Sequence, residues 1–319
     1  MPVGGDLVSA SSSVMPAKKK KMDKESVTLL CVAMPFVLFI IAFCYVPLAG
    51  WALSFFKYTP GMPFSKIPFV GLQYFRWMFT NEFPEIRRVM VNTLAMSGLG
   101  LLASPLPVVV AVLLNELSST KFKKTVQTMT TLPNFISWVI LFSLAFGMFS
   151  SEGIINKLLM DLGLIRQRLM VLDNNGIVWG FQTALGIWKG AGWGAIIYMA
   201  AITGIDMELY EAATVDGAGR FMRAVHITLP GLTPTYFVLL LLGIGGILSA
   251  AGLDQYLVFH NGLVAARIET LDYYVYRVGI VTKSYSYTTA VGMLKSIISV
   301  TLLFGANYLS KKARGSSIF

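Results

Sequence analysis

Six apolar stretches, each long enough to cross a lipid bilayer, constrain what this 319-residue chain can fold into. A helix needs roughly 20 residues to cross a hydrocarbon core of about 30 Å. Backbone groups cannot stay unpaired in lipid, and the runs lack the alternation of barrel strands, so the sequence predicts an all-α membrane protein with six spans. The expected spans are 27–56, 89–115, 125–151, 174–205, 224–253 and 284–310.

The overall composition agrees with a membrane protein. Hydrophobic residues make up 55% of the chain and charged residues only 13%, which is too little charge to cover the surface of a soluble domain of this size. The net charge of +10 does not indicate nucleic-acid binding, because the basic residues are dispersed over loops and a tail beside the first span. Retention of positive charge in the cytoplasm and attraction to anionic membrane lipid account for it.

The positions of Lys and Arg predict the orientation in the membrane. Of the 26 such residues, 13 lie on one side if the spans alternate, 11 lie on longer loops of the other side, and two fall within spans. The bias is strongest at the first span, where the block 18–21 consists of four lysines and the following loop begins with the single Lys57. Both termini are therefore expected in the cytoplasm. Residues 1–25 are expected to be a disordered basic cytoplasmic tail, and residues 26–319 the six-span transmembrane domain.

A polar, helix-forming loop near 204–230 separates the fourth and fifth spans and is expected on the cytoplasmic face. It contains Glu211-Ala212-Ala213, then Gly217, and after nine further residues the segment 227–230, which reads Ile-Thr-Leu-Pro. The alanines favour helix, Gly217 permits a reversal of the backbone, and Pro230 can start a new helix. Two short helices joined at a glycine would form a knob that can seat in a groove of another protein.

This spacing is similar to the cytoplasmic signature loop of permease subunits in binding-protein-dependent ABC importers. Residues 69–75 resemble an element that precedes the second span in sugar-importer permeases, with Tyr74 in place of the usual Asn. Segments 113–117, 122–128 and 132–139 resemble the permeases that import polysaccharide and polygalacturonan fragments. The resemblance extends from about 69 to 310. It implies a type I ABC importer permease bundle in a bacterial plasma membrane, which imports oligosaccharides or polysaccharide fragments by alternating access.

The resemblance also implies partners. They are a second homologous permease subunit, an ABC ATPase dimer and an extracytoplasmic solute-binding lipoprotein. No G-x-x-x-x-G-K-[ST] motif occurs, so the partner ATPases would bind ATP and Mg²⁺, and neither a cofactor nor a metal site is expected in this chain. Two alternatives remain, a membrane-embedded enzyme acting on lipid-linked sugars and an ion-coupled sugar carrier. The first would need acidic or metal-binding clusters, and the second would need carboxylates inside the spans.

The resemblance assigns the contact with the ATPase to the knob. The small alanines would allow close seating, and charged groups would form hydrogen bonds across the interface. Arg220 is equally well explained by the excess of basic residues in cytoplasmic loops. The residues expected to couple this chain to the ATPase are Glu211, Ala212, Ala213, Asp216, Gly217, Gly219 and Arg220.

Candidate substrate-path residues come from two places. Lys189 lies inside the fourth span between Trp188 and a glycine-rich stretch that ends at Trp193, and a charge in the bilayer should face a cavity or find a partner. Alternatively, Lys189 extends to the outer membrane surface and the glycines serve helix packing. The second candidate patch, beside Pro133, consists of Asn134, Ser137 and Trp138.

Two further features of the later spans are interpreted as structural. Lys295, in the sixth span, is expected to extend to the outer surface. The small residues at 243–252 predict a helix-packing face, with a second permease subunit as one possible neighbour.

Overall fold

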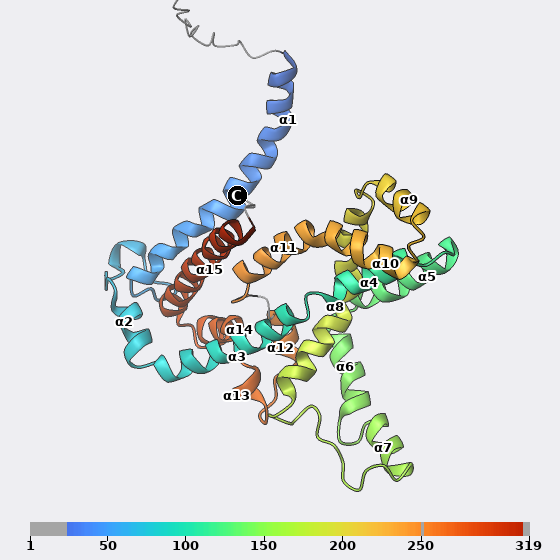
Figure 1. Ribbon diagram of the computed structural model, residues 1–319. Coiled ribbons are helices and arrows are strands. Elements are labelled where there is room, and N and C mark those ends of the chain that lie inside the picture. The colour runs from blue at the N-terminus through green and yellow to red at the C-terminus, as the bar shows by residue number, and fades with distance from the viewer. Residues whose placement is uncertain (1–23, 250–251, 315–319) are drawn as a thin grey trace, which may run out of the picture. The chain divides into compact units, whose positions relative to one another are not determined.

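The computed structural model describes residues 24–249 and 252–314, which are almost entirely helical (Figure 1). Within these residues, six helical stretches are long and apolar enough to cross a membrane, which confirms the predicted number of spans. The expected tail at 1–25 falls mostly outside the described residues. The six stretches are Val27–Phe55, Phe83–Asn115, Trp138–Asp161, Val178–Ile202, Arg220–Gly245 and Tyr285–Lys312.

Several spans consist of more than one helix. The first span contains α1 (Lys24–Ile40), a π turn and a 3-10 segment that ends at Phe55. The second span contains α3 (Phe83–Leu102) and α4 (Leu106–Asn115). The third span contains α6 (Trp138–Phe149) and α7 (Ile154–Asp161). The fourth is α8 (Val178–Ile202), the fifth contains α10 (Arg220–Arg223) and α11 (Leu229–Gly245), and the sixth is α15 (Tyr285–Arg314). The connecting helices are α2 (Gln73–Thr80), α5 (Thr120–Thr131), α9 (Met207–Val215), α12 (Leu253–Phe259), α13 (Ala265–Ile268) and α14 (Leu271–Tyr276).

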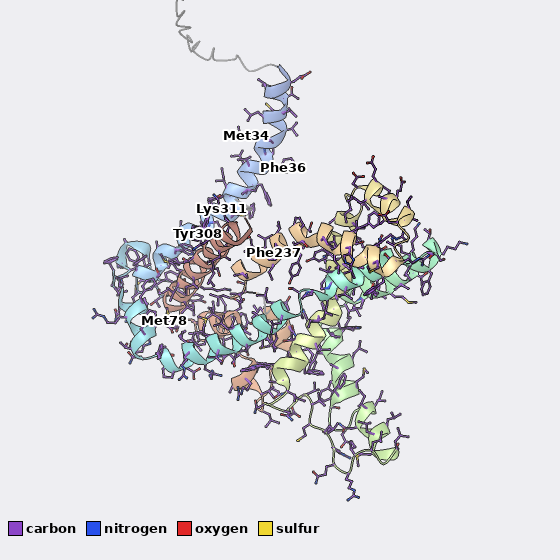
Figure 2. All side chains as sticks on the ribbon, viewed as in Figure 1. Met34, Phe36, Met78, Phe237, Tyr308 and Lys311 are labelled. Atoms are coloured by element: carbon purple, nitrogen blue, oxygen red, sulfur yellow. The ribbon has the colours of Figure 1, made fainter. Side chains whose placement is uncertain are left out.

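The chain divides into two compact units, residues 1–50 and 51–319. In the first unit, α1 and the turns that follow are apolar on every side, as expected for a helix surrounded by lipid. The second unit contains the other five spans and three buried clusters, of which the first includes Met78 of α2, labelled in Figure 2, packed with α3, α14 and α15. The other two clusters join α3, α6, α8 and α12, and α4, α8 and α11. The short helices α12 and α14 are thus packed among the spans.

Glycines in α8 allow neighbouring backbones to approach closely. A Cβ atom at Gly192 would lie 2.0 Å from the carbonyl oxygen of Thr130, and one at Gly194 would lie 3.2 Å from the ring of Pro107. The glycine-rich stretch of the fourth span therefore serves helix packing. At Gly245 of the predicted small-residue face, a Cβ atom would lie 3.0 Å from Leu303 of α15, so this position packs within the chain.

The expected boundary of the third span is wrong. The apolar stretch that can cross the membrane begins at Trp138 rather than Thr125. The preceding α5 is polar and ends at Thr131, and a 3-10 turn (Leu132–Phe135) follows it. Pro133 cannot donate a backbone hydrogen bond, and Ile136 is extended, so the helix stops and restarts. The side chain of Ser137 caps α6 by accepting a hydrogen bond from the Ile140 amide at 3.3 Å.

The fifth span also differs from the expectation. It begins at Arg220 and ends at Gly245 instead of extending over 224–253. Pro230 lies in the first turn of α11, as expected, but a wide π turn (Ala224–Thr228) connects α10 to α11 without a break. The π turn lies where Pro230 lacks the amide hydrogen for a regular helical bond.

Charged residues near the membrane find partners inside the second unit. The buried carboxylate of Glu269 accepts hydrogen bonds from Arg88 of α3 at 2.5 Å and from Arg277 at 2.6 Å. Lys295 ends on a carboxylate of the segment between the fifth and sixth spans, the side toward which its ammonium group is expected to extend. Its ammonium group is paired with Asp272 of α14, and its side chain is only 16% exposed. A carboxylate within reach removes the need to cross the remaining apolar layer to water.

Candidate functional site

The knob between the fourth and fifth spans has the geometry that its sequence predicts. The Asp206 side chain caps α9 by accepting a hydrogen bond from the Glu208 amide at 3.0 Å. The helix ends at Val215, and the chain reverses at Gly217, whose φ of +79° favours glycine. The amide of Ala218 donates to the Ala213 carbonyl at 2.8 Å and that of Gly217 donates to Thr214 at 3.1 Å, which is a Schellman motif. Glu211, Ala212 and Ala213 therefore lie on a well-defined helix followed by a sharp reversal.

Hydrogen bonds join the knob to the fifth span. The hydroxyl groups of Tyr210 and Thr228 are 2.9 Å apart, and Thr228 is fully buried where the π turn enters α11. Arg223 of α10 donates to the hydroxyl of Thr214 at 2.8 Å. The two hydrogen bonds thus connect α9 to both ends of the π turn, and through it to the start of α11.

The outer surface of the knob combines exposed apolar and charged side chains. Val215 is 88% exposed and Phe221 79% exposed. Among the described residues neither Glu211 nor Arg220 has an ion pair. An exposed apolar side chain such as Val215, next to charges that form no ion pair among the described residues, is typical of a surface that binds another protein. Of the seven residues assigned to coupling, Glu211, Ala212, Asp216, Gly217, Gly219 and Arg220 are exposed, and Ala213 is half-buried.

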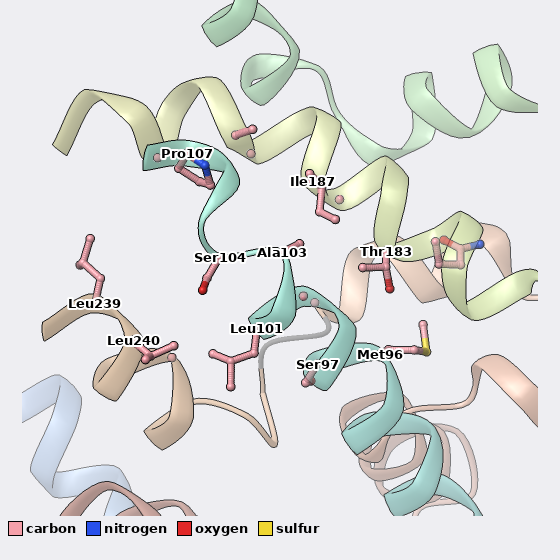
Figure 3. Close-up of a pocket in the computed structure, with 18 of the residues that line it drawn as sticks. Met96, Ser97, Leu101, Ala103, Ser104, Pro107, Thr183, Ile187, Leu239 and Leu240 are labelled. Atoms are coloured by element: carbon pink, nitrogen blue, oxygen red, sulfur yellow. The ribbon is translucent and has the colours of Figure 1, made fainter. Parts of the chain in front are cut away.

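A cavity of about 610 Å³, here called the inner cavity, lies between α3, α4, α6, α8, α11 and α12 (Figure 3). No charged side chain occurs among the described residues that line it. Burial raises the pKa of the Tyr256 hydroxyl, which therefore stays protonated and can donate a hydrogen bond. The hydroxyl, amide and aromatic side chains of the wall are Ser97, Ser104, Trp138, Gln182, Thr183, Tyr198, Tyr236, Gln255 and Tyr256.

Two hydroxyl groups of the inner cavity are buried without a hydrogen-bond partner among the described residues. They belong to Ser97 of α3 and Thr183 of α8, both labelled in Figure 3. Other polar groups of the wall are paired, since the hydroxyls of Ser104 and Tyr236 are 3.0 Å apart and the side chains of Gln182 and Gln255 are joined by a 2.7 Å hydrogen bond. Buried hydroxyls are nearly always hydrogen-bonded, so a partner for Ser97 and Thr183 is expected from outside the described residues.

Lys189 is held by backbone carbonyl groups. Its ammonium group donates to the carbonyl oxygens of Pro133 at 3.3 Å, Asn134 at 2.6 Å and Ile136 at 2.7 Å. It also lies 5.7 Å from the ring centroid of Trp138. These carbonyls lie at the break before α6, where only the Pro133 oxygen also accepts a bond from a loop amide, that of Ile136 at 3.1 Å, so Lys189 helps to satisfy the interruption of a membrane helix. Lys189 therefore finds a partner within the protein, as one sequence interpretation expects, and it is not among the residues that line the inner cavity.

The other residues predicted for the substrate path are divided between two environments. Trp138 lines the inner cavity, whereas Asn134 contributes a carbonyl to Lys189 and Ser137 caps α6. Trp188 and Trp193 are about half exposed and do not line the inner cavity, and the ring of Trp193 packs edge-on against Phe135 at 5.7 Å. The structure thus brings Lys189 and the patch at 134–138 together and leaves the two tryptophans apart from the cavity.

Residues 103–315 match the family model described as binding-protein-dependent transport system inner membrane component. The chain belongs to this family. As a permease it is 40% identical to Protein LplB of Bacillus subtilis (strain 168) over 287 residues, which cover 89% of both chains. It is 37% identical to the polygalacturonan/rhamnogalacturonan transport system permease protein YteP of the same organism over 288 residues, covering 90% of this chain and 88% of YteP.

Solved structures share the fold of this permease. A chain in the crystal structure of a bacterial alginate ABC transporter, in complex with a periplasmic protein that carries an alginate pentasaccharide, aligns with a TM-score of 0.80 at 31% identity. The alignment covers 92% of the permease and 98% of that chain. The all-helical bundle is therefore a type I ABC importer permease fold.

Sequence reasoning missed most of the inner cavity of the permease. The wall residues recur with helical spacing, as in Ser97 and Leu101 on α3 or Thr183 and Ile187 on α8. A stripe of small and hydroxyl-bearing residues on one face of an apolar span was the available signal. Charged and aromatic residues alone do not reveal this stripe.

Proposed function

We propose that this chain is the transmembrane permease subunit of an ATP-driven importer for oligosaccharides or polysaccharide fragments. One observation carries the proposal: the two spans joined by the knob, α8 and α11, are also two walls of the inner cavity. A force applied to α9 therefore acts on the cavity directly. The names of similar permeases and the alginate transporter support a saccharide as the substrate.

The knob would dock on one subunit of an ABC ATPase dimer. The small side chains of Ala212 and Ala213 allow close approach, while Glu211 and Arg220 supply hydrogen bonds to partner groups of opposite charge. ATP and Mg²⁺ would be bound by the ATPase. The excess of basic residues in the tail and on the same side as α9 supports a cytoplasmic location for the knob and both termini.

Transport would proceed by alternating access. A second homologous permease would complete the path, and an extracytoplasmic solute-binding lipoprotein would deliver the saccharide to it. In this chain, Ser97 and Thr183 would hydrogen-bond sugar hydroxyls, and Trp138 and Tyr256 would contact the apolar faces of sugar rings. Closure of the ATPase dimer would change the relative positions of α8 and α11 and so open the cavity to the other side.

Filling the inner cavity should block transport. Ser97→Leu is expected to lower the initial rate of ATP-driven oligosaccharide uptake about tenfold, because the larger side chain occupies the cavity and removes a hydroxyl. Uptake is measured in proteoliposomes that contain the complete importer and its binding protein. Ser143→Leu is the control, since Ser143 is exposed on α6 and outside the cavity. Normal uptake by Ser97→Leu at normal abundance, or wild-type uptake without an ATPase, would contradict the proposal.

Loosening the link between the knob and α11 should uncouple ATP hydrolysis from uptake. Tyr210→Phe removes the hydrogen bond with Thr228 and is expected to reduce the sugar imported per ATP hydrolysed about threefold. The measurement is the ratio of uptake to phosphate release in the same proteoliposomes. Tyr308→Phe, at an exposed position of α15, serves as the control. An unchanged ratio in Tyr210→Phe would show that this hydrogen bond does not transmit the movement.

A further inference from the structure

A second cavity of about 670 Å³, here called the outer cavity, lies at the opposite membrane face from α9. Its lining includes Lys57, which follows the first span, Glu82, which precedes the second, and Tyr287, at the start of the sixth. With six alternating spans these three ends share one face, and α9, between the fourth and fifth spans, lies on the other. In the orientation proposed above, the outer cavity faces the extracytoplasmic side.

The walls of the outer cavity are held in place by buried contacts. The hydroxyl groups of Tyr274 and Tyr287 are 3.1 Å apart. Arg277 is fixed by its 2.6 Å hydrogen bond to the buried Glu269 and lies over the ring of Tyr274, 5.6 Å from its centroid. The amide of Tyr58 donates to the hydroxyl of Ser286 at 2.9 Å, which connects the first loop to the sixth span. A cavity with fixed walls binds a ligand without first paying to become ordered.

The chemistry of the lining combines aromatic faces with hydrogen-bonding groups. Trp77 is 47% exposed and lines the outer cavity from α2, together with Tyr74 and Gln73 of the same segment. Lys57 and Arg277 contribute positive charge, and Glu82 and Glu85 contribute negative charge. A sugar ring has an apolar face that stacks on an aromatic side chain and a rim of hydroxyls that bonds to amide, carboxylate and ammonium groups. A lipid tail would not use these polar groups.

We propose that the outer cavity is a second saccharide-binding site, separate from the inner cavity, in which Trp77 is the stacking platform and Gln73, Glu82 and Lys57 bond the sugar hydroxyls. The class of ligand rests on the proposed function. The volume lies within the range of about 300–1,000 Å³ typical of small-molecule sites, so the outer cavity accommodates part of an oligosaccharide. The site binds saccharide that has left the binding protein before it enters the membrane.

The test uses the purified importer complex in lipid nanodiscs without its solute-binding protein. Binding of cellotetraose, maltotetraose, tetragalacturonate and an alginate tetrasaccharide is measured by saturation-transfer NMR and equilibrium dialysis. At least one is expected to bind, and Trp77→Ala is expected to weaken that binding about tenfold. Trp77→Phe, which keeps an aromatic face, is expected to retain most of it. Phe79→Ala is the matched control, because Phe79 lies on the same helix, is 58% exposed and does not line the outer cavity.

Binding to the outer cavity is distinguished from binding to the inner cavity by Ser97→Leu, which should leave it unchanged. Equal binding by Trp77→Ala and wild type, no binding of any of the four saccharides, or loss of binding in Ser97→Leu would overturn the inference. So would loss of solute-binding-protein affinity in Trp77→Ala with saccharide binding intact, which would make the cavity a protein contact. ATP-driven uptake by the wild-type importer tests the proposed function separately, and the two can fail independently.

Discussion

Glu211→Arg is expected to reduce ATP-driven uptake at least about 100-fold while the permease remains folded in the membrane. Glu211 is exposed on α9, and among the described residues it forms no ion pair that the substitution would break. The free energy of folding should therefore change little. In the docked complex, however, a positive charge would replace a negative one at a desolvated interface, where one unpaired charge costs about 2–5 kcal/mol.

The measurement pairs uptake with recovery of the ATPase on the purified permease. Both should fall together in Glu211→Arg. Glu208→Arg is the matched control, because Glu208 is an exposed carboxylate of the same helix and is not among the residues assigned to coupling. Normal uptake and ATPase recovery by Glu211→Arg at normal abundance would refute the assignment of α9 as the docking helix.

Lys189→Met is expected to destabilise the permease by about 2 kcal/mol or more, because each buried carbonyl that loses its partner costs about 1–3 kcal/mol. Lys189 donates to the carbonyl oxygens of Pro133, Asn134 and Ile136, and that of Pro133 keeps a bond from the Ile136 amide, so two oxygens depend on the lysine. The loss is measured as the midpoint of unfolding in a detergent titration, and Lys189→Arg, which keeps the donors, should recover part of it. Lys157→Met is the control, since Lys157 is exposed on α7.

The same variant separates two roles for Lys189. If Lys189→Met unfolds as wild type does but loses uptake, the lysine acts on the passing substrate, as the path interpretation of the sequence holds. If stability falls and the residual folded fraction transports normally, its role is to complete the broken third span. The second result is the expected one.

The features that sequence predicted well are local. The lengths of the apolar runs give the six spans, because crossing a bilayer needs a minimum length of apolar helix. The helix at Glu211–Ala213 and the reversal at Gly217 follow from helix propensity and from the one residue type that readily adopts φ of +79°. Neither feature depends on a distant part of the chain.

The features that sequence missed depend on distant contacts. Lys189 donates to carbonyls that precede it by more than 50 residues. Lys295 pairs with Asp272 because the short helix α14 packs among the spans. No local pattern states which partner a charge in a span will find. The break at Pro133 was visible, but the strongly apolar stretch that follows masked the polarity of α5 and moved the expected boundary. The site assignments for coupling and substrate remain predictions.

The uncharged wall of the inner cavity has a consequence for the energetics of the cell. A hydronium or metal ion that entered the inner cavity would lose part of its hydration. Among the described lining residues, no side chain of opposite charge would compensate for that loss. A polyhydroxylated neutral molecule exchanges its water for hydroxyl and amide groups at little cost. In the proposed function, the wall that this subunit contributes therefore favours hydroxyl-bearing cargo over small ions.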